Sequence, residues 1–300
     1  MTADINLTPT CTYFEIGGGR MALPARSWGT PNDSRSAALL VHGLGAHSGW
    51  FQAFARQLKV RRIYTVSFDL KALASERDEW VDDASVWVDE VIFAYDNLRR
   101  QLGPSVPINL IGNSAGALLC IAACEFIRPD GLILCSPGFQ GYPKTFTKQY
   151  QLVTILKACL WPQLEVEVPY TPDMVSRDPA SVRFMTDDVM RRFKLPGKML
   201  LELLLLSQRT MKWLKHLDQF PAPLLMLTAG QDRIVDNVAS EQVYRRIPAP
   251  YKQAHSFEHA WHDLMFDPVV DEVADWVLRW QGYLRDGSAD GTATGGMGSR

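Results

Sequence analysis

The stretch INLIGNSAG, residues 108–116, decides the fold, because it joins an apolar segment to a small-residue turn and then to a second apolar segment. Residues 106–111 have the composition of a buried strand, and residues 115–127 that of a buried helix. The pattern Gly-x-Ser-x-Gly between them is typical of a serine on a sharp strand-to-helix turn, where small flanking residues avoid neighbouring backbone. The sequence therefore predicts a nucleophile elbow at Ser114, with a serine that merely caps a core helix as the alternative.

Strand-like and helical segments alternate on both sides of this elbow. Glycines at positions 17–19 predict a hairpin over residues 11–27. Further along, the alternation favours a mostly parallel central sheet with helices on both faces, which defines the α/β fold class. The other strands are expected at residues 37–42, 63–68, 131–135, 224–228 and 251–256, and the other helices at residues 49–59, 80–100 and 263–283.

The alternation is interrupted once, after the sixth expected strand. Residues 138–217 contain several helical stretches and no convincing strand, so we predict that they form an inserted helical cap, called the cap segment below. The α/β core then comprises residues 1–137 and 218–283. Residues 284–300 are rich in Gly, Ala and Ser and have almost nothing to bury, so a disordered tail is expected there.

Composition and charge exclude several classes of protein. A chain of 300 residues with 47% hydrophobic and 21% charged residues is an ordinary globular protein. Its formal net charge of −2 supplies no field that would attract nucleic acid. The apolar run at residues 199–206 is too short to cross a bilayer, and the N-terminus does not read as a secretory signal. Five cysteines without metal-site spacing favour reduced thiols, so a cytoplasmic protein without metal or cofactor is expected.

A serine nucleophile needs backbone amides that hold the negative charge developing on the carbonyl oxygen of its substrate. One amide is expected from Ala115, directly after the serine. The second is expected from Leu44, because the sequence VHGLGAH at residues 41–47 follows a strand and its glycines allow the backbone to turn. The residues expected to contact the substrate beside these amides are His42, Gly43, Asn113 and Phe139.

The acid that would orient a catalytic histidine is expected in the last third of the chain, after the serine and before the histidine. Asp232 lies just past the strand at residues 224–228, at the sheet edge where sites of α/β proteins gather. Asp236 is the second candidate, and for both residues a turn or a helix cap is the alternative role.

The base is expected from the histidines that follow this acid. His262 lies thirty residues after Asp232, on the loop before the last expected helix, which places it at the same sheet edge. His255 and His259 are the alternatives, and Asp263 is expected to cap the last helix.

Together, these segments resemble the α/β-hydrolase fold, and within it the monoacylglycerol lipase and lysophospholipase-like serine hydrolases. The likeness covers most of residues 12–283. It implies that Ser114 is the nucleophile, that Asp232 is the acid, and that His262, followed by an acidic residue and leucine, is the base. It also implies an oxyanion hole made by the amides of Leu44 and Ala115. The segments that carry the likeness are HGLGAHSGWF (42–51), GNSAG (112–116), LILCSP (132–137), SRDP (176–179), PLLMLTAGQDRIVD (223–236) and HAWHDLMFD (259–267).

The resemblance implies a serine esterase that cleaves medium- or long-chain acyl esters of the monoacylglycerol or lysophospholipid type. An acyltransferase or an aminopeptidase would use the same three residues, and a noncatalytic binding module is the alternative from a different class. The chain departs from the family at Asn113, where a histidine or another bulky residue is usual, and at residues 69–75, where both glycines of the family's Asp-x-Arg-Gly-His-Gly-x-Ser loop are replaced.

The cap segment carries enough apolar side chains to line an acyl tunnel. On a helix expected at residues 195–217, Leu201 and Leu205 fall within an otherwise polar arc. They predict a patch that contacts a lipid surface or a partner chain, with coverage by another part of the cap as the alternative. The side chains expected to line the tunnel are Phe139, Phe146, Leu152, Ile155, Leu156, Trp161, Phe184, Met199 and Trp213.

Overall fold

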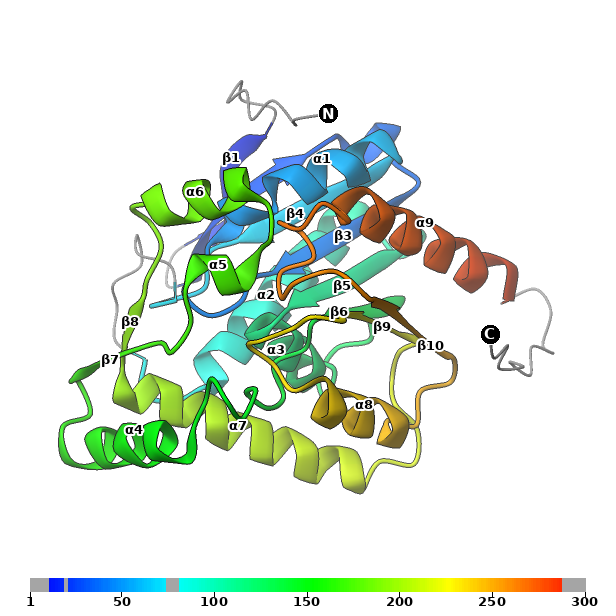
Figure 1. The fold of residues 1–300 in the computed structure, drawn as a ribbon. Coiled ribbons are helices and arrows are strands. Elements are labelled where there is room, and N and C mark those ends of the chain that lie inside the picture. The colour runs from blue at the N-terminus through cyan, green and yellow to red at the C-terminus, as the bar shows by residue number, and fades with distance from the viewer. Residues whose placement is uncertain (1–10, 19–20, 74–80, 288–300) are drawn as a thin grey trace.

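The computed structural model describes residues 11–18, 21–73 and 81–287, and Figure 1 shows them arranged around one twisted sheet. Eight strands form this sheet in the order β1-β2-β4-β3-β5-β6-β9-β10. β1 pairs with β2, and β2 with β4, in the antiparallel direction, whereas all other pairs are parallel. The strands are β1 (Thr12–Gly18), β2 (Met21–Trp28), β3 (Ser36–Val41), β4 (Ile63–Phe68), β5 (Ile108–Asn113), β6 (Gly131–Cys135), β9 (Leu224–Ala229) and β10 (Lys252–Phe257).

Helices cover both faces of the sheet. On one face, α1 (Gln52–Val60) and α9 (Val270–Gly287) pack over the side chains of Ala38 and Leu40 of β3. On the other face, α2 (Ser85–Leu102), α3 (Ala115–Ala123) and α8 (Asn237–Arg246) belong to the cluster that contains Leu39 and Val41. Because both faces of the sheet are buried, the sequence of β3 is a nearly continuous apolar run and does not alternate between apolar and polar residues.

The cap segment lies between β6 and β9. Figure 1 shows its helices α4 and α7 side by side, with α5 and α6 nearer to α1 in this view. The expectation that it contains no strand is wrong, because β7 and β8 pair antiparallel, with Val166 opposite Leu195. Each has three residues and one buried side chain, too little for a readable alternation. The elements are α4 (Lys148–Leu160), β7 (Glu165–Glu167), α5 (Pro172–Val175), α6 (Pro179–Asp187), β8 (Lys194–Pro196) and α7 (Gly197–Lys215).

Several helix boundaries differ from the prediction; α3, for example, ends at Ala123 rather than at residue 127. α2 begins at Ser85, whereas its predicted start at residue 80 lies outside the described residues. α9 begins at Val270 rather than at residue 263 and continues to Gly287. Residues 288–300 of the predicted tail lie outside the described residues. None of the described helices combines the length and the apolar character needed to cross a membrane.

Candidate active site

Ser114 occupies a strained turn between β5 and α3. Its φ of 53° and ψ of −120° lie outside the regions that a residue with a side chain normally adopts. A Cβ atom on Gly112 would approach the carbonyl oxygen of Gly116 to 2.5 Å, and one on Gly116 would collide with the carbonyl oxygen of Val41. The turn also receives a hydrogen bond of 2.9 Å from Gly138 N to Ser114 O. The glycines of the predicted elbow are therefore sterically required, and the turn holds Ser114 at the carboxyl end of the sheet.

Ser114, His262 and Asp232 form a continuous hydrogen-bonded chain. Ser114 Oγ lies 2.9 Å from His262 Nε2, and His262 Nδ1 lies 2.8 Å from Asp232 Oδ2. Asp232 Oδ1 accepts hydrogen bonds of 2.8 and 2.9 Å from the amides of Ile234 and Val235, which fix the carboxylate. A neutral imidazole with its proton on Nδ1 donates to Asp232 and accepts from the serine hydroxyl.

The electrostatic surroundings of His262 favour its protonated form. Burial alone would lower the pKa of the imidazole, but the charge of Asp232 and its hydrogen bond outweigh burial and raise the pKa above its ordinary value. The buried carboxylate of Asp263 adds to this effect. An imidazole with a raised pKa binds a proton more tightly, which suits a group that receives one from a hydroxyl.

Asp263 does not cap α9, contrary to expectation, because that helix starts at Val270. Instead, its carboxylate is buried and accepts a hydrogen bond of 2.9 Å from the side-chain amide of Asn113, beside the nucleophile. Burial raises the pKa of Asp263, while the neighbouring His262 and the hydrogen bonds oppose that rise. Asn113 thus connects the elbow to the loop that carries the histidine.

The two amides expected to form an oxyanion hole are free to bind a ligand. Within the described residues, neither Leu44 N nor Ala115 N donates a hydrogen bond to the protein. A Cβ atom on Gly43 would lie 3.0 Å from Ser114 Cβ, and one on Gly138 would lie 3.1 Å from Ala115 N. The backbone on both sides of the serine therefore approaches it closely. Such an approach is needed if the amides of Leu44 and Ala115 are to bind an oxyanion formed at Ser114.

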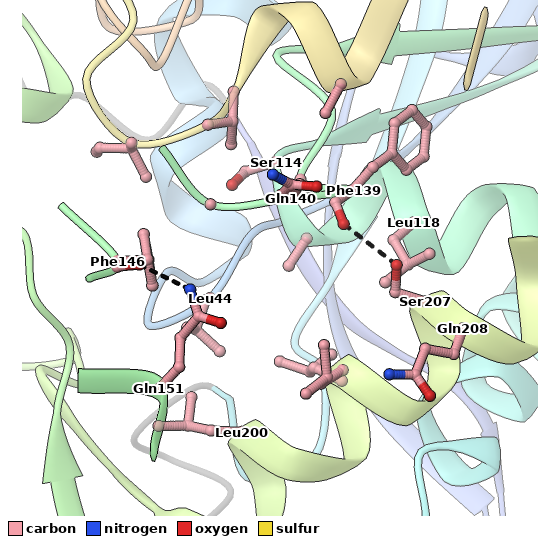
Figure 2. Close-up of a pocket in the computed structure, with 18 of the residues that line it drawn as sticks. Leu44, Ser114, Leu118, Phe139, Gln140, Phe146, Gln151, Leu200, Ser207 and Gln208 are labelled. Carbon is pink, nitrogen blue, oxygen red and sulfur yellow. Dashed lines mark hydrogen bonds between the residues drawn. The ribbon is translucent and has the colours of Figure 1, made fainter. Parts of the chain in front are cut away.

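A large apolar cavity opens beside Ser114, with a volume of about 930 Å³. Figure 2 shows Ser114 on one wall of the cavity, Leu200 and Gln151 on the opposite wall and Leu44 between them. Gln151 Nε2 donates to Phe146 O at 2.7 Å, which fixes that side chain against the cap segment. Apolar groups dominate the lining, so the cavity suits a hydrocarbon chain. Further lining residues include Leu118, Phe139, Ile155, Tyr170, Leu203, Met211 and Val235.

A second cavity, of about 30 Å³, lies on the other side of the serine. It is lined by His262, which does not line the large cavity, and by Tyr170 and Arg191 of the cap segment. A space of this volume is large enough to hold water. The large and the small cavity thus meet at Ser114, and the small one is on the histidine side.

The residues expected to contact substrate lie in different places. Phe139 lines the large cavity, whereas Gly43 and Asn113 line the small one. His42 lines neither of these cavities in the described structure. Its Nδ1 lies 2.9 Å from Gly43 O, and its Nε2 accepts from Leu70 N at 3.0 Å. Burial lowers the pKa of His42 to about 4, so the ring is neutral and holds two backbone segments together.

The alternative candidates for acid and base lie apart from Ser114. Asp236 caps α8, where its carboxylate accepts from Val238 N at 2.9 Å. His255 stacks on Trp276 with ring centroids 4.4 Å apart. His259 is exposed. None of the three is within hydrogen-bonding distance of Ser114.

The apolar side chains of the cap segment divide into several groups. Phe139, Phe146 and Ile155 line the large cavity as expected. Leu152, Leu156 and Trp161 are exposed instead, with 58%, 49% and 61% of their surface accessible. The other three pack elsewhere: Phe184 stacks on Phe266, Met199 is buried in the core, and Trp213 packs against Phe220.

The expectation of an exposed patch at Leu201 and Leu205 is wrong. Both side chains are half-buried, and Leu201 lines the large cavity. Most of the polar arc of α7 is exposed, but the carboxylate of Glu202 is buried and binds Lys198 Nζ at 2.7 Å and Arg209 Nη2 at 3.1 Å. It also accepts from Ala84 N, just before α2, at 3.4 Å.

Sequence reasoning missed most of the wall that α7 contributes to the large cavity. Leu200, Leu203 and Leu204 all line it. Residues 199–206 indicate such a wall, because their leucines are distributed around most of the helix circumference. Such a helix needs two covered sides, and here one side packs on α3 while the other faces the cavity.

The chain is similar in sequence to known hydrolases. A model of the family described as serine aminopeptidase, S33, matches residues 32–269. Monoglyceride lipase of Homo sapiens is 25% identical over 246 residues, which cover 80% of this chain and 79% of the relative. Phospholipase YtpA of Bacillus subtilis (strain 168) is 21% identical over 245 residues, which cover 77% of this chain and 88% of the relative.

Solved structures show the same fold. A soluble variant of monoglyceride lipase from Saccharomyces cerevisiae, in complex with a substrate analog, matches with a TM-score of 0.82 at 19% identity over 93% of this chain and 97% of that one. Monoacylglycerol lipase of Paleococcus ferrophilus matches with a TM-score of 0.74 at 24% identity over 88% and 100%. The predicted α/β-hydrolase fold and its monoacylglycerol lipase-like character are confirmed. Because the family match spans most of the chain, the chain belongs to the serine aminopeptidase S33 family of α/β-hydrolases.

Proposed function

We propose that the protein is a serine esterase that hydrolyses medium- or long-chain acyl esters of the monoacylglycerol or lysophospholipid type. The observation that carries this proposal is the hydrogen-bonded chain from Ser114 through His262 to Asp232 at the wall of an apolar cavity of about 930 Å³. The names of the relatives, monoglyceride lipase and phospholipase, support the same class of substrate.

In the proposed reaction, Ser114 Oγ attacks the ester carbonyl while His262 Nε2 takes the hydroxyl proton. Asp232 stabilises the imidazolium and keeps its orientation. The carbonyl oxygen becomes an oxyanion that accepts hydrogen bonds from the amides of Leu44 and Ala115. His262 then gives its proton to the leaving alcohol, and a water molecule resolves the acyl-enzyme by the same steps.

The position of His262 determines which cavity takes which half of the ester. The leaving oxygen must reach His262 Nε2 to receive its proton, so the alcohol lies on the side of the small cavity. The acyl chain then extends into the large cavity, past Phe139 and Ile155 towards α7. Each buried methylene contributes about 0.8 kcal/mol, which favours longer chains until the cavity is filled.

The direct test labels Ser114 and follows ester turnover. Purified protein should react with a fluorophosphonate probe and hydrolyse 1-monoacylglycerols, and Ser114→Ala should abolish both. His262→Ala should lose activity to a similar extent, and the double variant should be no worse, because the two residues act as one proton-transfer unit. Labelling with no hydrolysis of acyl esters from butyryl to oleoyl would contradict the proposed substrate class. Product analysis with added alcohol separates hydrolysis from acyl transfer.

An aminopeptidase is the second candidate, because the matched family carries that description. Such an enzyme must hold the ammonium group of a peptide N-terminus, normally with a carboxylate. Among the described residues that line the two cavities, Asp263 is the acidic one, and it is already bound to Asn113. This lining favours an ester over a peptide, and a chromogenic aminoacyl amide tests the difference.

We also propose a transient contact between the cap segment and the surface of lipid aggregates. The exposed side chains Leu152, Leu156 and Leu160 follow one another at helical spacing along α4, and Trp161 continues the row. This row is called the α4 stripe below. On the same helix, Ile155 lines the large cavity, so the stripe lies close to the entrance for acyl chains. Exposed apolar patches of this kind mark interaction surfaces.

A further inference from the structure

The cap segment holds the loop that carries the Leu44 amide. Tyr170 Oη donates a hydrogen bond of 3.1 Å to Leu44 O, and Arg192 N donates one of 3.0 Å to Gly45 O. The carbonyl groups of the consecutive residues Leu44 and Gly45 are thus both bound by residues far away in the sequence. The loop, residues 43–50, is called the oxyanion loop below.

Asp188, which follows α6, is the centre of a second set of contacts to this loop. Its Oδ2 lies 2.9 Å from His47 Nε2 and accepts a hydrogen bond of 2.6 Å from Trp50 Nε1. Its Oδ1 accepts from Met190 N at 2.9 Å. The side chains of His47 and Asp188 are only 6% and 8% exposed, so water competes little for these bonds. Asp188, His47 and Trp50 are called the Asp188 clamp below.

The charge state of Asp188 suits this role. Burial opposes ionisation, but the hydrogen bonds from His47 and Trp50 outweigh it and lower the pKa of the carboxyl group below its ordinary value. Hydrogen bonds to an ionised acceptor are shorter and stronger than those between neutral groups. The clamp is therefore a charged link between the cap segment and the oxyanion loop.

The backbone of the oxyanion loop packs closely against its neighbours on both sides. Gly45 has a φ of 73°, and a Cβ atom there would collide with the carbonyl oxygen of Arg192. On the other side, Gly43 already lies against Ser114. The oxyanion loop is thus enclosed between the nucleophile and the segment that follows Asp188.

We propose that Asp188 is a positioning residue for the oxyanion hole, which aims the amide of Leu44 when the cap segment is seated. The inference rests on the proposed serine esterase mechanism. Oxyanion stabilisation depends on donors fixed in advance, and loss of one donor lowers kcat by roughly 10²–10³-fold. A displacement of about 1 Å can cost on the order of 10²-fold. Release of the clamp therefore lowers transition-state stabilisation without removing any reacting group.

The test compares three variants with one control. Asp188→Asn keeps the shape and removes the charge, Asp188→Ala removes both, and Trp50→Phe removes one donor. Asp187→Asn is the matched control, because Asp187 is exposed and its side chain makes no hydrogen bond within the described residues. With a short soluble ester such as p-nitrophenyl butyrate, we expect kcat to fall about 10–100-fold in Asp188→Ala and less in the other two, with KM within about twofold.

A transition-state readout separates positioning from a structural role. An alkylboronic acid forms a tetrahedral adduct with the serine and places an oxygen in the oxyanion hole, so its Ki should weaken in proportion to kcat/KM across the variants. A purely structural role would lower the unfolding midpoint and leave kcat per folded molecule and the boronate Ki unchanged. If Asp188→Ala does not fold, Trp50→Phe and Asp188→Asn carry the same comparison.

The outcomes distinguish this inference from the proposed function. An active wild-type enzyme with an equally active, folded Asp188→Ala variant would overturn the clamp and leave the esterase intact. The rate of Ser114 labelling by a fluorophosphonate also depends on the oxyanion hole and needs no ester. A slower labelling rate in the clamp variants would support the inference even if the esters tested are not substrates, and an equal rate would refute it.

Discussion

The side-chain amide of Asn113 donates a hydrogen bond of 2.9 Å to the carboxylate of Asp263, which lies 150 positions later in the chain. This bond joins the residue before the nucleophile to the residue after the proposed base. It holds a second carboxylate near His262, besides Asp232, and that carboxylate contributes to the raised pKa of the imidazole.

The first prediction concerns the pH profile of the enzyme. In the proposed mechanism only neutral His262 accepts the serine proton, so kcat/KM should rise with pH through a midpoint above 6.5, the ordinary histidine value. Asp263→Asn removes a negative charge and should shift that midpoint to lower pH. The exposed Asp271→Asn is the control and should leave it unchanged. An unchanged or higher midpoint in Asp263→Asn would show that Asp263 does not act on the imidazole.

The second prediction separates the two candidate acids. Asp232→Asn should lower kcat by about 10⁴-fold, because an amide stabilises the wrong imidazole tautomer. Asp236→Asn should cost far less, since Asp236 caps α8. Matched kinetics and circular dichroism on both variants test this ranking. The reverse order would assign the acid role to Asp236.

The third prediction concerns stability rather than activity. The pKa of His42 is about 4 in the folded protein and 6.5 in its ordinary state, so between these values the unfolded chain binds a proton that the folded protein excludes. Stability should therefore fall as pH falls from 6.5 to 4, by up to about 3 kcal/mol from this residue. His42→Asn should flatten that slope in denaturant titrations, whereas the exposed His216→Asn should not. Equal slopes for His42→Asn and wild type would contradict the prediction.

The fourth prediction concerns acyl chain length. Leu200 lies across the large cavity from Ser114, as Figure 2 shows. Leu200→Trp should block the far part of the cavity and lower kcat/KM for dodecanoyl esters by about 10-fold, while butyryl esters are hydrolysed as before. Leu278→Trp is the control, because Leu278 lies on α9 and its side chain is exposed. A uniform loss at all chain lengths would place the acyl chain elsewhere.

The fifth prediction tests the α4 stripe. Leu156→Glu combined with Leu160→Glu should reduce hydrolysis of vesicle-borne monoacylglycerol by about 10-fold or more, because charged groups do not enter a lipid surface. Activity on a short soluble ester should be unchanged. Val60→Glu, at an exposed position of α1, is the control. Equal rates for the folded double variant and wild type on vesicles would exclude the contact.

The fold was predictable because its determinants are local. The strand, turn and helix around Ser114 form one continuous stretch. The steric reason for Gly112 lies within that stretch, whereas Gly116 is required by the neighbouring strand that carries Val41. Parallel strands end at one edge, so Ser114 after β5, Asp232 after β9 and His262 near the end of β10 were expected to approach one another.

The features that sequence analysis missed depend on distant partners. The role of Asp263 depends on Asn113, and that of Asp188 depends on His47 and Trp50. The burial of Glu202 on α7 was missed as well, because this carboxylate is bound by cations from its own helix and by the backbone before α2. Helical periodicity records which residues share a face, but a buried ionic cluster and a solvent-exposed face have the same periodicity.

The small cavity beside His262 has a consequence for the two stages of the proposed reaction. An ester would bring an alcohol larger than about 30 Å³ to this side of Ser114, so the walls, which include Arg191 and Tyr170, would have to move apart. The second stage needs space only for water, which the cavity provides as it stands. On this mechanism, acylation would need an opened enzyme, whereas hydrolysis of the acyl-enzyme would not.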